Sequence, residues 1–566
     1  MNHSQLTNLF FYQKACNKLN ACEVMKMFTN ISPVLMILFF LFSFINQTGA
    51  FTPIKKYIDA PGILISPDFS LKVNGTASIS VEKTRYLSYA KFALAGKGGS
   101  IKIQITVLAN SFNSVNLWPR KSCIVPSVEK KLKTITFTVS GNLLSIPQKF
   151  IVKADSMYMA VFIDLPEINK PKLTDVNVKN ILDFGIDNIG ATLQTSNIQN
   201  AINWMANNRE GKTILYFPNG IYKSASITIS NSLQIYLQEG VRVQGSQVTG
   251  DYPGAENDEG GYFSASFFRV KGNGTTSFKL FGRGMIDGHG TEIFIGTGNR
   301  NISLLYITNC SRVIIDDVIF RESSGWTCHV ENSSDIRINN VKVVNPSVHT
   351  GPFMTSHFWN HSFDATSCQN YTNNNSFAWS NDDCIAIMSR DRDNNNITFN
   401  NLLGFTISSG VRLGWNSSMN SKNISIINSE FVQTAYATIS LHELKNNAVY
   451  DKVTFSNCWF DTETSVGWRD DSIKKYVFFR VFSPNWGSGF AKINTLAFRN
   501  CNIEKQGYMF FAGDSVHTVK NIIFDNVTIG NKIISNQKDI TNLTLLHVTN
   551  VSFLKPKKTL QKLMAK

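Results

Sequence analysis

The chain has 566 residues and a formal net charge of +15 at neutral pH. That length exceeds what one ordinary domain holds, so two folded domains are expected. With 43% hydrophobic and 17% charged residues, the composition is that of a soluble globular protein. The positive charge would suit an anionic partner, but only the tail at residues 555–558 concentrates it. No nucleic-acid partner is therefore expected.

The first 50 residues contain a candidate secretory signal. Lys26 precedes an apolar run at residues 34–45, and small residues follow at 48–50, as in a cleavable signal peptide. Translation from Met25 or Met27 and an uncleaved anchor are the alternatives. Repeated N-x-S/T sequons support an extracellular location, although stacking in turns would leave many of them unused. We expect a secreted protein that leaves the membrane after signal cleavage.

Residues 51–170 are predicted to form a small β-sandwich. Segments 100–107, 134–139 and 157–163 alternate between apolar and polar residues and lie between Gly, Ser and Asn breaks. Such short alternating strands are typical of an all-β domain. Prolines between residues 166 and 171 then indicate a linker.

Residues 176–560 are predicted to form a parallel β-helix, which makes the whole fold all-β. A helix over residues 195–207 would cover its open first coil, since Ile198, Ala201, Ile202 and Met205 keep helical spacing. Beyond it a pattern recurs, mostly about 22 to 30 residues apart, as in solenoids. Alternating residues are followed by Asn, which tolerates a left-handed turn. Examples are segments 312–318, 335–341, 396–402, 423–429 and 521–527.

Three acidic residues interrupt this array. Asp382 and Asp383 are adjacent, and Asp364 lies one short coil upstream. Adjacent strand residues point to opposite faces, so both members of the pair reach one site only at a strand end or bulge. Inverting glycosidases place two carboxyl groups roughly 6.5–9.5 Å apart, a range that acids on adjacent coils can span. Their mutual repulsion should raise at least one pKa.

Several segments resemble the pectinase-like right-handed β-helices. They are residues 216–222, 236–241 and 282–288, and the run 381–387 is similar to the aspartate-pair motif of two families. One family contains the polygalacturonases (glycoside hydrolase family 28), and the other contains the dextranases and isopullulanase (family 49). Residues 408–415 lack the Gly-His-Gly of the polygalacturonases, and residues 435–441 lack their Arg-x-Lys. Residues 413–417 instead resemble a Met-Gly-Trp-Thr-Ser run of the dextranases, which also carry an N-terminal β-sandwich.

The resemblance implies a secreted, endo-acting hydrolase that cuts α-glucosidic bonds of a glucan with inversion. It assigns Asp382 as general acid, with Asp364 and Asp383 positioning and activating water. Trp415 would stack on a sugar face or pack in the core. Arg412 would hydrogen-bond sugar hydroxyls or Asp383, or lie on the surface. Asn381 completes the predicted substrate-binding residues.

Two other functions remain open: a polygalacturonase-like pectinase, and a non-catalytic β-helix that binds glycans. His361 and His442 lie near the acids in sequence, but a lone His is more often structural, and neither is predicted to be catalytic. The sequence contains no CxxC or His/Cys cluster, so no metal or cofactor is expected. Cys310, Cys458 and Cys501 follow Asn at one repeat position and are interpreted as stacked small hydrophobes. The partner is predicted to be a polysaccharide, and the protein a monomer.

Overall fold

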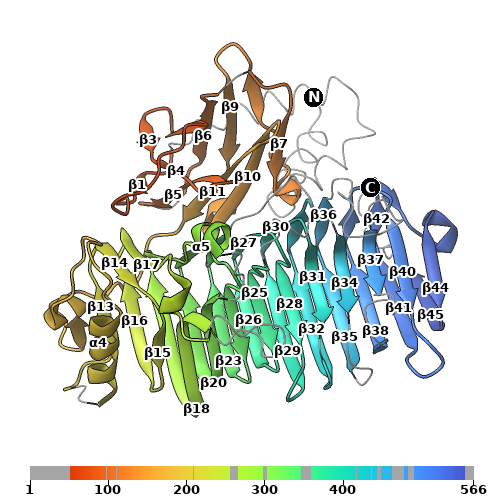
Figure 1. Cartoon of the computed structure of the whole chain (residues 1–566). Coiled ribbons are helices and arrows are strands. Elements are labelled where there is room, and N and C mark those ends of the chain that lie inside the picture. Colours follow the sequence, from red (N-terminus) through yellow and green to blue (C-terminus); the bar gives the residue numbers. More distant parts are fainter. Residues whose placement is uncertain are drawn as a thin grey trace, which may run out of the picture.

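The computed structural model in Figure 1 describes residues 51–554, apart from several internal segments. Those segments are residues 97, 110, 208–209, 255–264, 298–301, 346–358, 416, 435, 443–447, 462–476 and 482–489. The predicted leader at residues 1–50 lies outside the described residues. Within them, no helix combines the length and apolar character needed to cross a membrane.

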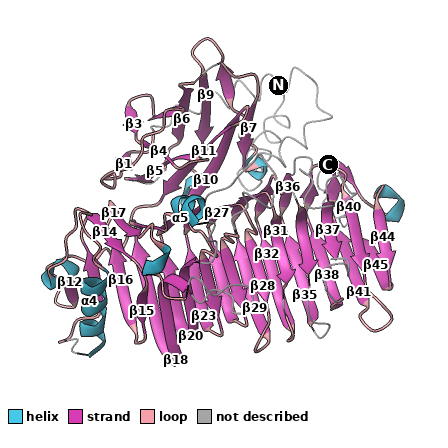
Figure 2. Cartoon of the chain, in the orientation of Figure 1, coloured by secondary structure: helices cyan, strands magenta, loops and turns pink. Residues whose placement is uncertain are grey.

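The N-terminal unit is a sandwich of two β-sheets (Figure 2). One sheet has the order β1 (Ile54–Lys56), β5 (Ser88–Leu94), β11 (Met157–Asp164), β10 (Gln148–Ala154) and β7 (Val115–Trp118), with β4 (Val81–Lys83) beside β5. The other has the order β3 (Ala77–Ile79), β2 (Phe69–Val73), β6 (Ile101–Val107), β9 (Thr134–Val139) and β8 (Ser127–Glu129). Alternate residues of β6 are buried, as its period-two pattern predicts. An apolar core fills the space between the sheets.

The second unit is a long parallel β-helix. In the described residues its larger sheet contains β12 (Val178–Asn180), β13 (Ile214–Phe217), β15 (Ile227–Ile229), β16 (Leu233–Leu237), β18 (Ala265–Gly282), β20 (Ile302–Asp316), β22 (Cys328–Glu331), β23 (Ser334–Asn339), β25 (Phe363–Thr366), β26 (Gln369–Asn374), β28 (Ile385–Met388), β29 (Asn394–Asn400), β31 (Ser409–Gly414), β32 (Ser421–Ile427), β34 (Ala437–His442), β35 (Val449–Ser456), β37 (Val477–Val481), β38 (Lys492–Arg499), β40 (Tyr508–Ala512), β41 (Val519–Asp525), β44 (Leu543–Leu546) and β45 (Val548–Leu554).

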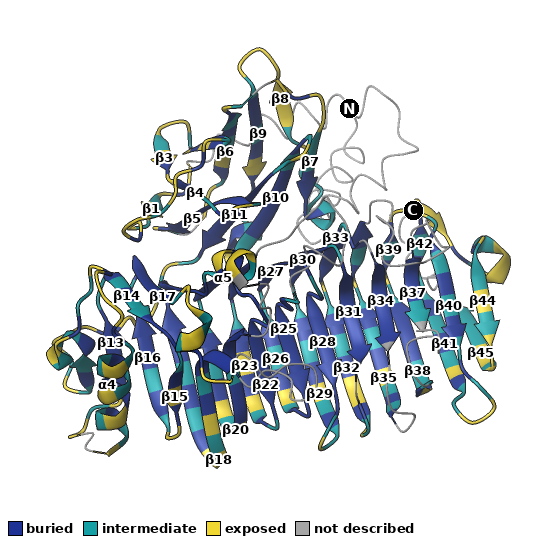
Figure 3. Ribbon diagram, viewed as in Figure 1, coloured by how far each residue is buried: buried dark blue, intermediate teal, exposed yellow. Residues whose placement is uncertain are grey.

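A smaller sheet closes the coils. It contains β14 (Gly220–Ser224), β17 (Val241–Gly245), β19 (Met285–Asp287), β21 (Ile319–Arg321), β24 (Lys342–Val344), β27 (Phe377–Ser380), β30 (Leu403–Thr406), β33 (Glu430–Val432), β36 (Trp459–Asp461), β39 (Asn502–Ile503), β42 (Thr528–Ile529) and β43 (Lys532–Ile533). Successive coils pair in parallel, as β25, β28 and β31 do. One continuous apolar core runs along the inside (Figure 3). The predicted parallel β-helix behind a small β domain is confirmed.

Helices are few. The helix α4 (Thr195–Asn207) covers the first coil, and its buried residues are the four that the sequence predicts. A second helix, α5, spans Gly290–Thr297. Short 3-10 turns are η1 (Arg120–Ser122), η2 (Leu143–Ser145), η3 (Ile181–Phe184), η4 (Thr249–Asp251) and η6 (Gln537–Asp539).

Asparagines at the turns form ladders from coil to coil. Asn375, Asn401 and Asn428 all have left-handed φ angles, between 50° and 56°. The Asn401 side chain donates to Asn375 Oδ1 at 2.9 Å, and Asn428 donates to Asn400 Oδ1 at 2.9 Å. The turn role predicted for Asn is therefore confirmed. Cys310, Cys458 and Cys501 are buried in the core as free thiols, as predicted.

The sandwich packs on the smaller sheet of the β-helix. One apolar cluster joins Tyr158 and Phe162 of the sandwich to Phe377, Trp379 and Phe405 of the β-helix. At the same interface Lys342 Nζ lies 2.7 Å from Asp164 Oδ1, and both side chains are at most 2% exposed. The two units therefore share one buried interface.

Candidate active site

The three predicted acids lie together near β25 and β28. Asp364 is on β25 between Phe363 and Ala365, which belong to the inner core. Side chains alternate across a strand, so Asp364 faces away from that core. Asp382 and Asp383 lie in the turn between β27 and β28. The pair therefore occupies a strand end, where both carboxylates can turn toward one site.

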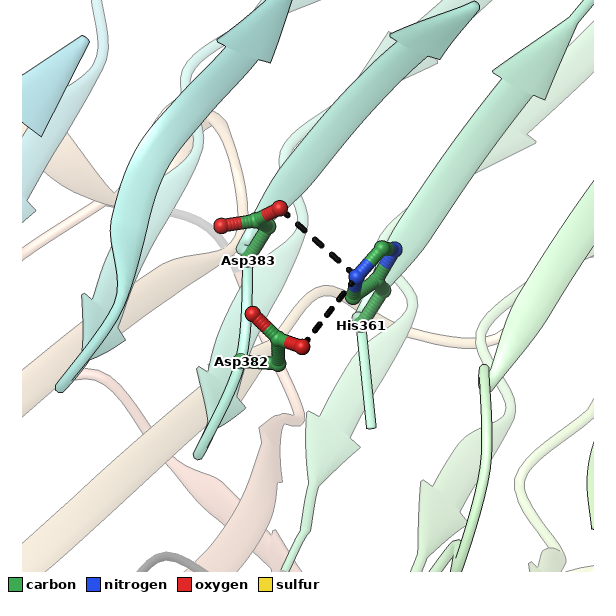
Figure 4. A group of neighbouring side chains, drawn as sticks. All are labelled: His361, Asp382 and Asp383. Atoms are coloured by element: carbon green, nitrogen blue, oxygen red, sulfur yellow. Dashed lines mark ion pairs between the residues drawn. The ribbon is translucent and has the colours of Figure 1, made fainter. Parts of the chain in front are cut away.

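His361 lies beside these carboxylates, and Figure 4 shows one edge of its ring facing both Asp382 and Asp383. Its Nδ1 lies 2.6 Å from Asp364 Oδ1. On the opposite edge of the ring, Nε2 lies 3.4 Å from Asp382 Oδ2 and 3.6 Å from Asp383 Oδ2. Trp326 stacks on the imidazole, with ring centroids 4.7 Å apart and planes 14° apart. These contacts fix the ring in the middle of the acid cluster.

The pKa values of His361 and Asp364 are both raised, for different reasons. Burial lowers the pKa of His361, but the carboxylates of Asp364 and Asp382 outweigh it and raise that pKa to about 10. Burial raises the pKa of Asp364, the His361 imidazolium opposes that shift, and Asp383 adds to it. The expectation that crowding raises a carboxyl pKa holds for Asp364, although burial is the larger cause.

Asp383 is held on several sides. Its carboxylate accepts hydrogen bonds from Arg412 Nε and Nη2, from Ser408 Oγ at 3.0 Å and from the Ser409 backbone N–H at 3.1 Å. Arg412 lies on β31, directly opposite Ala386 of β28. From the sequence, Arg412 was expected to bond sugar hydroxyls or Asp383, or to lie on the surface; the structure shows it bonded to Asp383. Asp383 is fully buried, and these donors stabilise it as an anion.

Asp382 is the accessible acid of the three. Its side chain is 13% exposed, while those of Asp364 and Asp383 are 0% exposed. Its backbone carbonyl accepts hydrogen bonds from Ser380 Oγ at 2.9 Å and from Thr406 Oγ1. The turn is thereby fixed while the carboxylate keeps access to solvent.

The predicted substrate-binding residues differ in position. Trp415 is partly buried, packs beside Trp326, Ala386 and Met388, and lies 5.9 Å from the Arg412 guanidinium. Asn381 is fully buried, and its backbone N–H donates to Asn360 Oδ1 at 2.8 Å. Trp415 thus lies close to the acids at the outer face, whereas Asn381 is buried and helps to fix the turn through its backbone hydrogen bond.

Asp364 and Asp382 lie on opposite sides of the His361 ring. An inverting hydrolase needs room for a water molecule between its two carboxyl groups. Between Asp364 and Asp382 that room is occupied by the imidazole. Asp364 therefore contacts the site through His361, while Asp382 and Asp383 face the same ring nitrogen directly. The role of Asp364 in activating water stays a prediction.

Sequence reasoning missed His361 and Trp326. The sequence favours a structural role for His361, and Trp326 lies on an earlier coil, just before β22, with nothing in its own segment to connect it to the acids. The nearest available signal was the position of His361 three residues before Asp364. The side chain of His442 is outside the described residues.

The donor types of His361, Asp382 and Asp383 could also hold a metal ion, because one ligand atom of each lies within 4.8 Å of the others. A ligating imidazole must be neutral, whereas Asp364 and Asp382 favour the charged form of His361. Both oxygens of Asp383 already accept hydrogen bonds from Arg412.

One row of register partners crosses the larger sheet through the site. Asp364 lies opposite Ala386, Ala386 opposite Arg412, Arg412 opposite Ser440, and Ser440 opposite Arg480. In the other direction, Asp364 lies opposite His329 and His329 opposite Tyr306. Arginines pair with aromatic rings beside this row: Arg269 with Tyr306, Arg390 with Trp326, Arg412 with Trp415 and Arg480 with Tyr436.

Comparison with known proteins identifies the class of fold. Residues 178–434 match a family described as rhamnogalacturonase A/epimerase, pectate lyase-like. A family 28 exopolygalacturonase from Yersinia enterocolitica is similar in structure, with a TM-score of 0.50, 15% identity, and 81% of this chain and 97% of that chain covered. The second unit is therefore a pectate lyase-like right-handed parallel β-helix.

Two further solved structures match with TM-scores below 0.5. An exopolygalacturonase from Thermotoga maritima has a TM-score of 0.47 at 16% identity, covering 68% of this chain and 93% of that one. An endo-xylogalacturonan hydrolase from Aspergillus tubingensis has a TM-score of 0.41 at 16% identity, covering 67% and 93%. No curated protein matches the sequence.

Proposed function

We propose that this protein is a glycoside hydrolase that cuts a polysaccharide with Asp382 as its general acid. The observation that carries the proposal is the Asp382–Asp383 pair at a strand end, with Asp382 accessible and Asp383 buried and bonded to Arg412 and Ser408. Two carboxyl groups in different surroundings are what acid and base roles require. The match to a pectate lyase-like family of polysaccharide-active enzymes supports the same reading.

In this mechanism Asp382 donates a proton to the leaving glycosidic oxygen. Asp383 stabilises the positive charge that develops on the sugar ring and receives the proton of the attacking water. One oxygen of Asp382 lies within 4.8 Å of one of Asp383, so the proposal of a single displacement that inverts the anomeric configuration rests on the family resemblance and not on the separation of this pair. Proton NMR of the first product tests this step: an α-linked substrate should yield the β anomer first, and early α anomer would contradict inversion.

For the substrate, we propose first a neutral α-glucan. The support is the resemblance of residues 413–417 to the dextranase run. Trp415 beside the acids also suits a sugar face. The hydroxyls of Thr438 and Ser440 on β34 add nothing to it, because both side chains are fully buried and bond to Thr434 and Ser409. Endo-acting cleavage of such a polymer is part of this proposal.

One observation favours an acidic polysaccharide as the second candidate. Strand β37, which pairs with β34 on the next coil, carries Arg480 directly opposite Ser440. A cation therefore lies one coil beyond the segment in which the polygalacturonases carry their Arg-x-Lys. Arg480 is partly exposed and lies 5.5 Å from the Tyr436 ring. A guanidinium can pair with a sugar carboxylate, which a neutral glucan would not require.

A reducing-sugar assay on dextran, pullulan, starch and polygalacturonate decides between these candidates. Each substrate is tested with the wild type, with Asp382→Asn and with Arg480→Gln. Cleavage of dextran or pullulan that Arg480→Gln leaves unchanged supports the neutral glucan. Cleavage of polygalacturonate that Arg480→Gln weakens supports the acidic polymer. Binding without cleavage of any polymer would contradict the hydrolase and favour a glycan-binding β-helix.

We also propose that the protein is secreted as a glycosylated monomer. The support is the signal-like run within residues 1–50 and the many sequons. Expression in a eukaryotic secretory host should release a protein whose N-terminus begins near residue 51 and whose mass falls on enzymatic deglycosylation. Retention of the full leader in a membrane fraction would contradict this.

A further inference from the structure

His361 faces carboxylate oxygens at both of its ring nitrogens. Asp364 accepts at Nδ1, and Asp382 and Asp383 both lie at Nε2. An ionised carboxylate offers only acceptor atoms. A neutral imidazole would direct one lone pair at these oxygens, which is repulsive. The geometry is satisfied when both nitrogens carry a proton.

The ring has little freedom to avoid these contacts. Trp326 stacks on one face of it, and the side chain is only 8% exposed. Asp364, which is 0% exposed, fixes the ring through the short Nδ1 contact. A carboxylate that orients an imidazole in this way determines which ring nitrogen faces Asp382 and Asp383.

The charged and titratable groups around His361 come from several strands. They are Asp364 on β25, Asp382 and Asp383 before β28, Arg412 on β31, His329 and Glu331 on β22, and Arg390 after β28. Arg390 lies 3.5 Å from Glu331 and 5.6 Å from the Trp326 ring, and Arg412 binds Asp383. The three carboxylates therefore meet His361 and Arg412 directly, while Arg390 pairs with Glu331 and its charge also acts on Asp364.

We propose that His361 is a positioning residue. Its positive charge holds Asp382 and Asp383 together and favours the ionised form of the Asp382 carboxyl, and Asp364 acts by orienting His361. The positive charge of His361 and its effect on the ionisation of Asp382 do not depend on the proposed function. The kinetic consequence rests on the proposed function, in which Asp382 must be protonated to act. An opposite charge within about 4–6 Å lowers a carboxyl pKa by about 1–3 units.

The first test needs no substrate. The mature secreted chain is labelled with ¹⁵N in histidine and ¹³Cγ in aspartate and titrated by NMR, with His361→Gln and Asp382→Asn assigning the signals. We expect His361 to remain doubly protonated at pH 8 and to become neutral there in Asp364→Asn. In His361→Gln, the Asp382 carboxyl should titrate about 1–3 pH units higher.

His329→Gln is the matched control. His329 is also buried and also packs on Trp326, but its Nε2 lies 3.1 Å from Thr366 Oγ1. A loss of packing alone would affect both variants, whereas the Asp382 titration should move only in His361→Gln. A neutral His361 at pH 8, or an Asp382 titration that His361→Gln leaves in place, would overturn the proposal.

Two further measurements complete the test. Elemental analysis of the purified protein should find no stoichiometric metal; a metal that His361→Gln removes would overturn the proposal by making the imidazole a ligand. On whichever polymer is cleaved, the alkaline limb of kcat/KM should move to higher pH in His361→Gln and stay in His329→Gln. If the NMR shifts occur and no polymer is cleaved, the electrostatic proposal stands and the proposed function fails.

Discussion

Asp382 and Asp383 are neighbours in sequence with different surroundings. The sequence was sufficient to place both at a strand end, because neighbouring residues within a strand cannot share a face. It was insufficient to find His361 facing both of them, since the orientation of a ring depends on its partners in three dimensions. Trp326, which stacks on that ring, is supplied by an earlier coil. The acids were thus predictable, and the group that connects them was not.

Replacing Asp382 tests the acid role at the residue scale. Asp382→Asn should reduce kcat by about 10²–10⁴-fold, the usual contribution of general acid catalysis. The side chain is partly exposed and the turn is held through its backbone carbonyl, so the fold should persist. Circular dichroism and thermal unfolding provide the control. Turnover close to that of the wild type on a cleaved polymer would rule out Asp382 as the acid.

The raised pKa of His361 should also make stability depend on pH. Burial lowers this pKa, but Asp364 and Asp382 raise it to about 10 from an ordinary 6.5. The folded state then binds a proton that the unfolded state releases between these values. The stabilisation is complete below pH 6.5 and is lost as pH rises through about 10, with a slope of about 1.4 kcal/mol per pH unit.

Urea unfolding between pH 6 and 10 measures this slope. The comparison is with His361→Gln, in which residue 361 cannot titrate, so that the contributions of groups remote from the site cancel. The wild type should lose stability relative to this variant as pH rises. Parallel stability curves for the two proteins would show that His361 binds no extra proton in the folded state.

At the scale of elements, the turn asparagines explain why the β-helix was predictable. A residue that tolerates left-handed φ recurs at each turn, and the inward residues alternate. Both properties are local, so the sequence pattern reveals them. The long-range contacts of the outer face are different. Ser440 lies opposite Arg480 only because β34 and β37, which are far apart on the chain, pair on adjacent coils, and motif comparison therefore assigned no cation to that place.

Asn428 allows the turn chemistry to be tested. It has a φ of 50°, donates to Asn400 Oδ1 at 2.9 Å and accepts from Asn457 Nδ2 at 3.2 Å. Asn428→Ala should cost about 1–2 kcal/mol for the left-handed conformation in addition to the lost ladder bonds. Asn428→Gly removes the same bonds without that strain. Chemical denaturation should therefore rank Ala as less stable than Gly; equal stabilities would mean that backbone conformation contributes little at this turn.

At the scale of the whole molecule, the sandwich and the β-helix are joined by buried charge as well as apolar packing. Asp164 at the end of β11 contacts Lys342 of β24 at 2.7 Å and accepts from Asn340 Nδ2 at 2.6 Å. Composition and strand patterns indicated two units but gave no indication of this interface, because its residues come from distant parts of the chain. The shared cluster around Trp379 and Phe405 should make both units unfold in one calorimetric transition.

The ion pair between Asp164 and Lys342 makes that coupling testable. Asp164→Asn leaves the Lys342 ammonium buried without its counter-ion, and breaking a buried pair in this way typically costs about 3–5 kcal/mol. Lys342→Met should cost less, because Asp164 keeps its hydrogen bonds from Asn340 and from the Tyr57 hydroxyl. The double variant removes both charges and should recover part of the loss. Calorimetry of the four proteins gives the coupling energy, and additive losses would show that the pair does not join the two units.

Because the interface lies on the smaller sheet and the acids face outward near the larger one, the variants should retain Asp382-dependent activity at temperatures where they are folded.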